Sequence, residues 1–196
     1  MAGREPLSLM VVDAGDKLTR GLAQLIPASE CPSRRCAASA GEARRMLNAA
    51  PADLLVINTP LSDETGLELA LSFSRDTTVA LLLVRAAEYP AVCRRTRDAG
   101  VLVLARPATG RQLADALTLM RAASLRLRQA VRKNESLRAK MEDIRTVNRA
   151  KWLLIGVRGM TEDEAHHYIE AQAMDLRLPR RQVAEAIISR LRDETP

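Results

Sequence analysis

The chain has 196 residues, with 30 basic and 24 acidic side chains and a formal net charge of +6. Hydrophobic residues make up 47% and aromatic residues only 2%, so an aliphatic core is expected, which suits helices and a small parallel sheet better than a β-sandwich or barrel. No apolar run approaches the roughly 20 residues of a membrane-spanning helix, and the first residues lack the layout of a secretory signal. We therefore expect a cytoplasmic protein.

The cysteines argue against a disulfide framework or a zinc site. Cys31, Cys36 and Cys93 are odd in number and lack the spacing of metal ligands. In a cytoplasmic protein such residues are ordinary reduced thiols. We expect no metal and no cofactor.

The excess positive charge is concentrated in the middle of the chain. Residues 1–108 hold 13 basic and 12 acidic side chains, residues 109–160 hold 12 and 4, and residues 161–196 hold 5 and 8. One interpretation is a polyanionic partner. The other is a long exposed helix that is solvated by its Arg and Lys side chains, and charge alone leaves both open.

Apolar runs alternate with amphipathic segments over residues 1–108. Strands are predicted at 7–13, 52–58, 79–84 and 101–107, and helices at 15–26, 39–50, 65–73 and 89–100. Ser39 is placed to cap the second of these helices. This alternation predicts a parallel, doubly wound sheet with helices on both faces, in which functional sites form at the carboxyl ends of the strands.

Three of those strand ends resemble the receiver domain of bacterial response regulators. The chain has V-V-D after the first strand, a residue before T-P at the end of the strand at 52–58, and R-P at the end of the last, where K-P is usual. The resemblance implies an α/β, flavodoxin-like fold with a five-stranded parallel sheet. In that family, paired acids hold Mg²⁺, an aspartate accepts the phosphoryl group, a Ser or Thr senses it and a lysine pairs with it.

The chain departs from that pattern. Asp13 is present, but its neighbour is Ala14, the acceptor position is Asn58, the sensor position falls near Val84 and the lysine is Arg106. An amide cannot form an acyl phosphate, and a lone carboxylate is a poor Mg²⁺ site. We predict a pseudo-receiver with a degenerate phosphorylation site, in which Asp13 is solvated or paired with Arg106.

A displaced phosphoryl acceptor is the alternative. Asp16 and Asp63 are the candidates, although neither is expected at a strand end.

The middle segment is predicted to form one long helix, because neither proline nor glycine interrupts it between Gly110 and Lys151. Its apolar residues follow a 3-4 spacing over about four heptads, which is typical of a coiled coil. The predicted dimer seam comprises Met120, Leu127, Asn134, Leu137, Met141 and Ile144. A polar residue such as Asn134 favours two strands in fixed register, so we expect a homodimer. The small residues Ala123 and Ala130 leave open a helix that folds back on its own receiver-like domain.

The C-terminal segment resembles the ANTAR domain, an output domain of antitermination regulators. Across residues 147–191 the chain follows the family's order with Ala150-Lys151, Leu153-Leu154-Ile155, Gly159, Thr161-Glu162, Glu164-Ala165, Ile169, Ala173-Met174 and Val183-Ala184.

The residues of this segment also predict its helices directly. Thr161 and Glu164 form a capping box for a helix that runs to about Met174, and Pro179–Leu191 forms a further helix. With the end of the long helix, they should make a small three-helix bundle. The side chains expected in its core are Leu153, Leu154, Tyr168, Ile169, Met174 and Ile187.

The ANTAR resemblance implies RNA binding. Members of the family hold small hairpins of a nascent leader transcript so that the terminator cannot form, and we therefore expect no enzyme and no catalytic residue. The candidate RNA-binding residues are Arg145, Arg149, Lys151, Trp152, Arg158, Arg177, Arg180 and Arg181. Lys151 lies at the family's A-K. Trp152 occupies a position that is usually small, where it could stack on a flipped base or pack in the core.

The predicted organisation is a receiver-like domain at 1–108, a coiled-coil linker at 109–140 and an ANTAR domain at 141–196. The expected partners are leader mRNA hairpins, a second copy of the chain, and a regulatory protein or ligand at the receiver-like domain. A DNA-binding regulator with a helix-turn-helix-like output and a coiled-coil hub for a partner protein are the alternatives. Steeply salt-dependent binding of hairpin RNA, absent for duplex DNA, would favour the first reading.

Overall fold

The chain divides into two compact units, Met1–Ala130 and Val131–Pro196. The computed structural model describes residues 6–29, 31–74 and 77–193, without the side chains of Asp16, Lys17 and Asp193. In chain order the elements are β1 (Ser8–Val12), α1 (Asp16–Leu25), β2 (Ser33–Ala37), α2 (Ala40–Ala49), β3 (Leu54–Asn58), α3 (Leu67–Phe73), β4 (Val79–Arg85), α4 (Tyr89–Thr96), β5 (Leu102–Arg106), α5 (Gly110–Arg158), α6 (Glu162–Leu176) and α7 (Arg180–Asp193).

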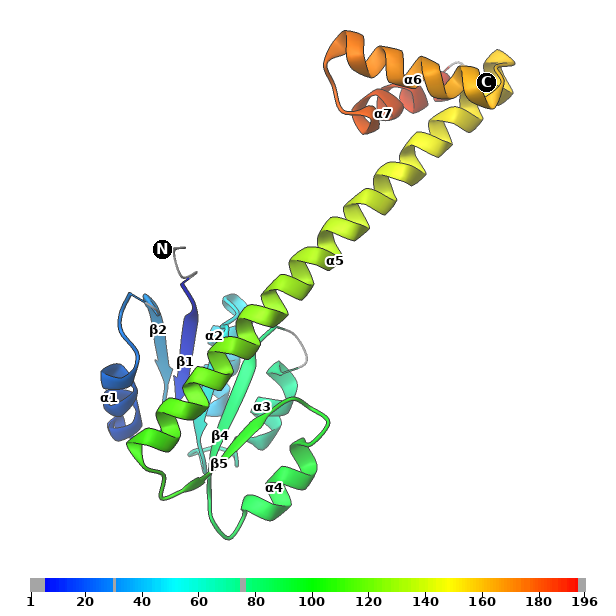
Figure 1. The fold of residues 1–196 in the computed structure, drawn as a ribbon. Helices are drawn as coiled ribbons and strands as arrows, with labels where there is room; N and C mark the ends of the chain where they lie inside the picture. The colour runs from blue at the N-terminus through cyan, green and yellow to red at the C-terminus, as the bar shows by residue number, and fades with distance from the viewer. Residues whose placement is uncertain (1–5, 30, 75–76, 194–196) are drawn as a thin grey trace. The chain divides into compact units, whose positions relative to one another are not determined.

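The first unit is built on a five-stranded parallel sheet with the order β2-β1-β3-β4-β5 (Figure 1). Its central strands are aliphatic runs that are buried on both faces, as parallel sheets require. In the register of the sheet, Leu55 of β3 lies between Met10 of β1 and Ala80 of β4. The predicted fold class is confirmed.

Strand β2 is an element that the apolar pattern does not reveal. Its sequence is SRRCA, and it lies at an edge of the sheet, where only one neighbour pairs with it. Both of its arginines turn back onto backbone carbonyls: Arg34 Nε donates to Cys31 O at 3.1 Å, and Arg35 Nη1 donates to Met46 O at 2.9 Å. Pairing with β1 and these hydrogen bonds stabilise a strand that has little apolar surface to bury.

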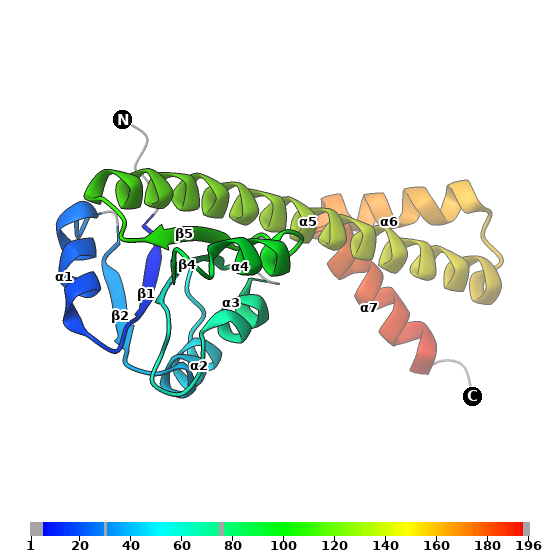
Figure 2. The same cartoon turned by 90° about the horizontal axis from the view of Figure 1, so that it is seen from below.

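Helices cover both faces of the sheet, as Figure 2 shows. The face formed by alternate residues such as Met10 and Leu82 packs against α2, α3 and α4. The opposite face, with Leu9 and Leu81, packs against α1 and the first part of α5. The alternation follows from the period of two along each strand.

The first turns of α5 belong to the core of the receiver-like unit. Leu117 is 6% exposed and Met120 is fully buried, and both pack against the sheet face that also contacts α1. The prediction that Met120 lies in a dimer seam is therefore wrong, because its own sheet encloses the side chain. For this part of the helix the fold-back alternative holds, and the compact unit extends to residue 130 rather than 108.

A partly buried ion pair fastens α5 to the sheet about two turns beyond Met120. Arg128 Nε donates to Asp53 Oδ1 at 2.8 Å, and Arg128 Nη2 lies 2.5 Å from Asp53 Oδ2. The backbone N–H and the hydroxyl of Ser8 each donate to Asp53 Oδ2 at 2.7 Å. Burial by itself raises the pKa of Asp53, but these hydrogen bonds and the charge of Arg128 together lower it below its ordinary value.

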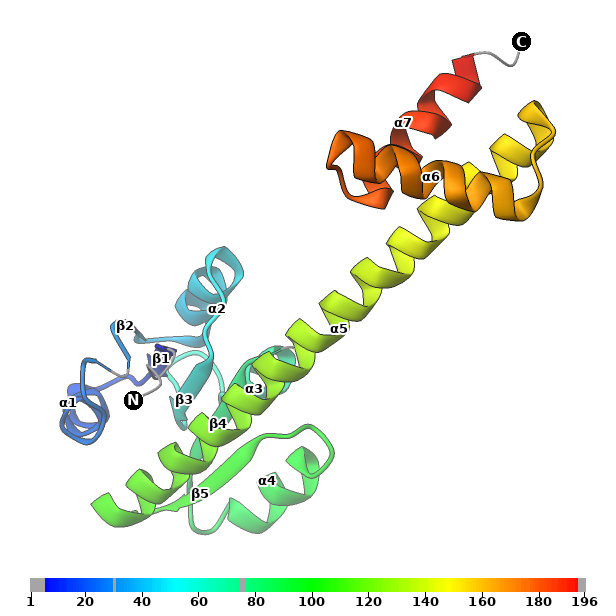
Figure 3. The same ribbon diagram turned by 45° about the horizontal axis from the view of Figure 1, so that its top comes forward.

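The second unit is a bundle of α6, α7 and the end of α5 (Figure 3). Ala150 and Leu154 of α5 pack with Ile169 of α6 and with Ile187 and Leu191 of α7. The capping box is confirmed, since Thr161 accepts from the backbone of Glu164 while the Glu164 carboxylate accepts from the backbone of Thr161.

One predicted core residue of the bundle is misplaced. Met174 is 78% exposed, because it follows the last buried turn of α6 on the outward side.

Among the residues that the structure describes, no helix is long and apolar enough to cross a membrane.

We predict that Asp53→Asn lowers the free energy of unfolding by about 2 kcal/mol, as for a lost hydrogen-bonded charge. The folded-state pKa of Asp53 lies below its ordinary value of 3.8. Its contribution is therefore present above that value and is lost as the pH falls through the lowered folded value. Urea unfolding at pH 7 and near pH 3 should show a larger difference between wild type and variant at pH 7 than near pH 3. Asp98→Asn, at an exposed position of the same unit, is the control and should match wild type at both.

Candidate functional site

Asp13, Asn58 and Arg106 stand at the carboxyl ends of β1, β3 and β5. Asn58 Nδ2 donates to Asp13 Oδ1 over 2.8 Å, and the backbone N–H of Gly15 donates to the same oxygen at 3.2 Å. Arg106 donates through Nη2 to the carbonyl oxygen of Thr59. The carboxylate of Asp13 is thus paired with the amide of Asn58, and the expected pairing with Arg106 is wrong, because Arg106 donates to Thr59 O instead.

This amide–carboxylate pair changes the chemistry of the position. Two carboxylates so close together would repel each other unless a cation or a proton lay between them. Because Asn58 is a neutral donor, the Asp13 carboxylate has a hydrogen-bond partner that does not require a cation or a proton between the two side chains. Val84, which lies near the sensor position, is 2% exposed and packs in the core with Leu82, so it presents no polar group to this end of the sheet.

The displaced-acceptor alternative finds no support at Asp63. Its two carboxylate oxygens accept from the backbone N–H groups of Ala40 at 2.9 Å and Gly41 at 2.8 Å, at the start of α2. These hydrogen bonds lower the pKa of Asp63. The carboxylate therefore serves to hold a helix N-terminus. The side chain of Asp16, the other candidate, lies outside the described residues.

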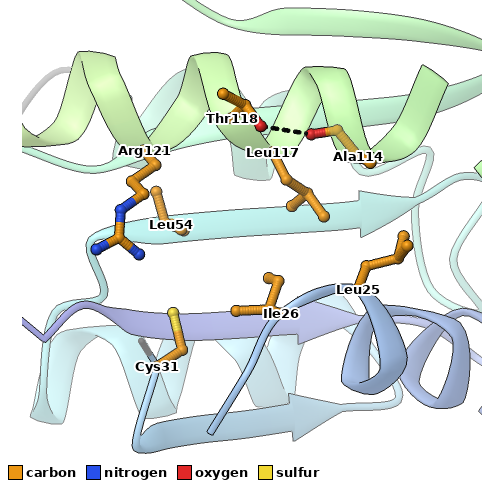
Figure 4. Close-up of a pocket in the computed structure, with 8 residues that line it drawn as sticks. All are labelled: Leu25, Ile26, Cys31, Leu54, Ala114, Leu117, Thr118 and Arg121. Atoms are coloured by element: carbon orange, nitrogen blue, oxygen red, sulfur yellow. Dashed lines mark hydrogen bonds between the residues drawn. The ribbon is translucent and has the colours of Figure 1, made fainter. Parts of the chain in front are cut away.

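Two of the cavities formed by the described residues lie in the first unit. One has a volume of about 120 Å³ and is lined by Leu25 and Ile26 at the end of α1 and by Leu117 of α5. Figure 4 shows these side chains, with the Thr118 hydroxyl donating to Ala114 O of its own helix at 2.9 Å. This volume is below the range of small-molecule sites. The other cavity has about 380 Å³ and lies between α3 and α4 beside the ends of β3 and β4.

The larger cavity has an apolar floor and a charged rim. Leu82 and Val84 line its floor, while Arg85 on the rim forms an ion pair with Glu88. Its size and lining fall within the range of ligand sites, and it lies at the carboxyl ends of strands, where such sites form in open α/β sheets.

In the second unit, Lys151 is committed to an ion pair. Its Nζ lies 2.9 Å from Glu162 Oε1, and the lysine side chain is only 16% exposed. The hydrogen bond from Lys151 and its charge lower the pKa of Glu162. Lys151 therefore ties the first turn of α6 to α5.

The arginines at the start of α7 also pair within the chain. Arg180 lies 2.7 Å from Glu170, and Arg181 lies 2.8 Å from Glu185 and 3.2 Å from Asp143. Together with Lys151, both arginines line a groove of about 370 Å³ that also holds Asn148 and His166. The carboxylates offset much of the positive charge on this side.

A second groove, of about 360 Å³, lies between α5 and α7. It is lined by Glu142, Arg145, Thr146 and Arg149 of α5 and by Glu185, Ile188 and Ser189 of α7. We call it the arginine groove. Arg149 is exposed, and Arg145 makes only a long contact of 3.8 Å with Glu142, with 72% of its side chain exposed. Contacts of that kind contribute little, so both guanidinium groups are available to an anion.

Trp152 is 72% exposed, so it does not pack in the core of the bundle, which the sequence had left open. Arg177 is the C-cap of α6 with φ 52°, and Arg158 is the last residue of α5; both are exposed. Of the predicted RNA-binding residues, Arg145 and Arg149 thus line the arginine groove, and Lys151, Arg180 and Arg181 line the other. Trp152, Arg158 and Arg177 do not line either groove. Sequence reasoning missed Thr146 and Ser189 of the arginine groove, because only the packing of α7 on α5 brings these hydroxyls beside the arginines.

Comparison with protein families matches residues 135–188 to the ANTAR domain. The match begins before residue 141, where the sequence pattern placed the boundary. The chain is 26% identical over 140 residues to the transcriptional regulatory protein PdtaR of Mycobacterium tuberculosis (strain H37Rv), covering 71% of this chain and 68% of that protein.

Solved structures similar to this chain include the signal receiver domain of an HD domain-containing protein from Pseudomonas fluorescens Pf-5. The TM-score is 0.56 at 20% identity, covering 66% of this chain and 96% of that one. A CheY-like receiver domain protein from Methanospirillum hungatei JF-1 gives 0.54 at 17% identity, covering 62% of this chain and 98% of that one. These likenesses show that the first unit has the receiver fold.

We predict that acetyl phosphate with Mg²⁺ transfers no phosphoryl group to this chain. The amide of Asn58 already donates to Asp13 and is not a nucleophile for acyl phosphate formation. Intact mass measurement after incubation checks this, with a phosphorylatable receiver domain as the positive control. A mass increase of one phosphoryl group on the chain would contradict the pseudo-receiver interpretation.

Proposed function

We propose that this chain, which carries an ANTAR domain at residues 135–188, is an RNA-binding regulator of transcription. In this proposal it binds hairpins in a nascent leader transcript and so prevents the terminator hairpin from forming. The observation that carries it is the arginine groove, in which Arg145 and Arg149 are exposed within the ANTAR domain.

The proposed action is binding and not catalysis. Exposed guanidinium groups supply phosphate contacts, which provide affinity but little sequence information. Hydroxyls such as those of Thr146 and Ser189 can donate to phosphate or sugar oxygens nearby. Sequence is then read on unpaired bases of a loop, whose edges a protein can reach.

A DNA-binding helix-turn-helix output receives less support from the bundle. The first residues of α7, Arg180 and Arg181, are engaged with carboxylates of their own chain, whereas a recognition helix presents this end to base edges. The other face of α7 is buried through Val183 and Ile187.

We also propose that the receiver-like unit is regulated without phosphorylation. The Asn58–Asp13 pair supports this, because an amide that is hydrogen-bonded to Asp13 occupies the position of the acceptor carboxylate. The cavity beside α4 offers a place for a small regulatory ligand, and a partner protein remains the other source of control.

A homodimer through the middle of α5 completes the proposal. Every residue from 129 to 142 is exposed in the single chain, and the seam residues Leu137, Met141 and Ile144 are 52%, 55% and 61% exposed. A helix surrounded by water over this length gains little from packing within its own chain. Burial of the seam against a second copy supplies the missing apolar contact.

We predict that the purified protein binds a hairpin RNA with an affinity that falls steeply with salt, and that duplex DNA of equal length binds more weakly. Arg149→Ala should weaken RNA binding severalfold and reduce the salt slope by about 1, as for one lost phosphate contact. Fluorescence anisotropy of labelled RNA at several salt concentrations measures both. Arg97→Ala, which removes the same charge from an exposed position of the first unit, should change neither.

Equal affinity for duplex DNA would contradict the RNA assignment. No binding of either nucleic acid in dilute buffer would favour the hub alternative.

We predict that Met141→Lys shifts the protein toward monomer, because it would place a buried like-charged pair in the seam. Sedimentation velocity measures the shift. Ala139→Lys is the matched control, since residue 139 lies on the opposite side of α5 from the seam and is exposed. A variant at position 141 that remains as dimeric as the control would mean that copies associate through another surface.

A further inference from the structure

Trp152 is the single tryptophan of the chain, and it stands on the outer surface of the ANTAR domain. Its exposed fraction of 72% is large for a residue that proteins usually bury in part. The chain contains only two tyrosines and one phenylalanine besides, so its cores use almost no aromatic surface. An exposed indole in such a chain calls for a ligand with a flat face.

The neighbours of Trp152 along α5 are cationic. Arg149 lies three residues earlier and Arg145 seven residues earlier, which places all three on one side of the helix. The helical rise puts Arg149 about 4.5 Å and Arg145 about 10 Å before the tryptophan along the axis. Both arginines line the arginine groove.

Open space lies beside Gly156, on the C-terminal side of Trp152 along α5. Gly156 follows Trp152 by one turn, and a Cβ added at Gly156 would meet nothing within 4 Å. A planar group can therefore approach the ring from the C-terminal side without displacing a side chain, while the arginines lie on the N-terminal side.

We propose that Trp152 stacks on an unpaired base of an RNA hairpin loop while Arg149 and Arg145 bind the phosphates of the adjoining strand in the arginine groove. The inference rests on the proposed RNA binding and adds the part of the RNA that this surface contacts. Aromatic side chains provide stacking on any base, and arginines beside them follow the backbone.

A second copy of the chain fits this surface less well. In a parallel two-fold dimer the same stripe of each helix faces its copy, so Arg145 and Arg149 would approach their own equivalents. Such a contact between like charges is unfavourable without an anion between them. A polyanion satisfies the same arginines directly.

The experiment uses the full-length protein and two labelled RNAs, a hairpin with an unpaired loop and the same hairpin with abasic nucleotides in that loop. Because the chain has one tryptophan, its fluorescence reports on Trp152 alone. Anisotropy of the label measures affinity separately. We expect the intact hairpin to quench the tryptophan and the abasic hairpin to bind with little quenching.

Substitutions separate stacking from packing. Trp152→Ala should weaken binding of the intact hairpin on the order of tenfold, with an unchanged salt slope, because stacking involves no counterion release. Trp152→Phe should restore most of the affinity, whereas Trp152→Leu should behave like alanine. None of the three should weaken binding of the abasic hairpin. Met174→Ala, at a position of the same unit that is 78% exposed, is the control and should bind like wild type.

The outcomes distinguish this inference from the proposed function. If wild type binds the hairpin but Trp152→Ala binds it equally well without a change in salt slope, the stacking inference fails and the RNA-binding proposal stands. If Trp152→Leu restores affinity or Trp152→Ala dissociates the dimer in sedimentation, the residue is a packing contact. If the wild type binds no hairpin, the proposed function fails first.

Discussion

The packing of α5 against the sheet is the contact on which the rest of the structure depends. Leu117 and Met120 fill the space between the helix and the sheet, and the Arg128–Asp53 ion pair closes it near the amino ends of the strands. The same helix then supplies Ala150 and Leu154 to the core of the second unit. One uninterrupted helix thus belongs to both cores, and each core fixes which of its faces is buried. The residues between them, from 129 to 142, are the part that no core determines.

Charged side chains find different kinds of partner in the two units. At the carboxyl ends of the strands, the neutral amide of Asn58 donates a hydrogen bond to Asp13, where a second carboxylate would repel it. Asp13 thus has a hydrogen-bond partner within the chain. In the ANTAR domain, carboxylates of α6 and α7 engage Lys151, Arg180 and Arg181 and stabilise the bundle. Arg145 and Arg149 of the arginine groove, by contrast, remain exposed, and Arg145 makes a long contact of 3.8 Å with Glu142.

This division explains why a family motif and a binding surface need not coincide. Lys151 stands at the A-K of the ANTAR resemblance, yet its side chain is 16% exposed and paired. Trp152, its neighbour, departs from the family and is the most accessible aromatic group on this surface. A helix turns by about 100° per residue, so adjacent residues face different surroundings, and one can hold the bundle together while the next faces solvent.

Local patterns in the sequence were enough to predict part of this structure. Apolar runs located four of the five strands, Ser39 and Thr161 marked two helix starts, and residues 147–191 carried the ANTAR resemblance. Other features could be seen only in the folded chain: the edge strand β2, the burial of Met120, the pairing of Lys151 and the exposure of Trp152 and Met174. Each depends on residues distant in the chain: β1 beside β2, the sheet beneath α5, or α6 across from Lys151. Local periodicity indicates which face of a helix or strand is apolar. Packing between elements determines which other element buries that face and at which residue the burial ends.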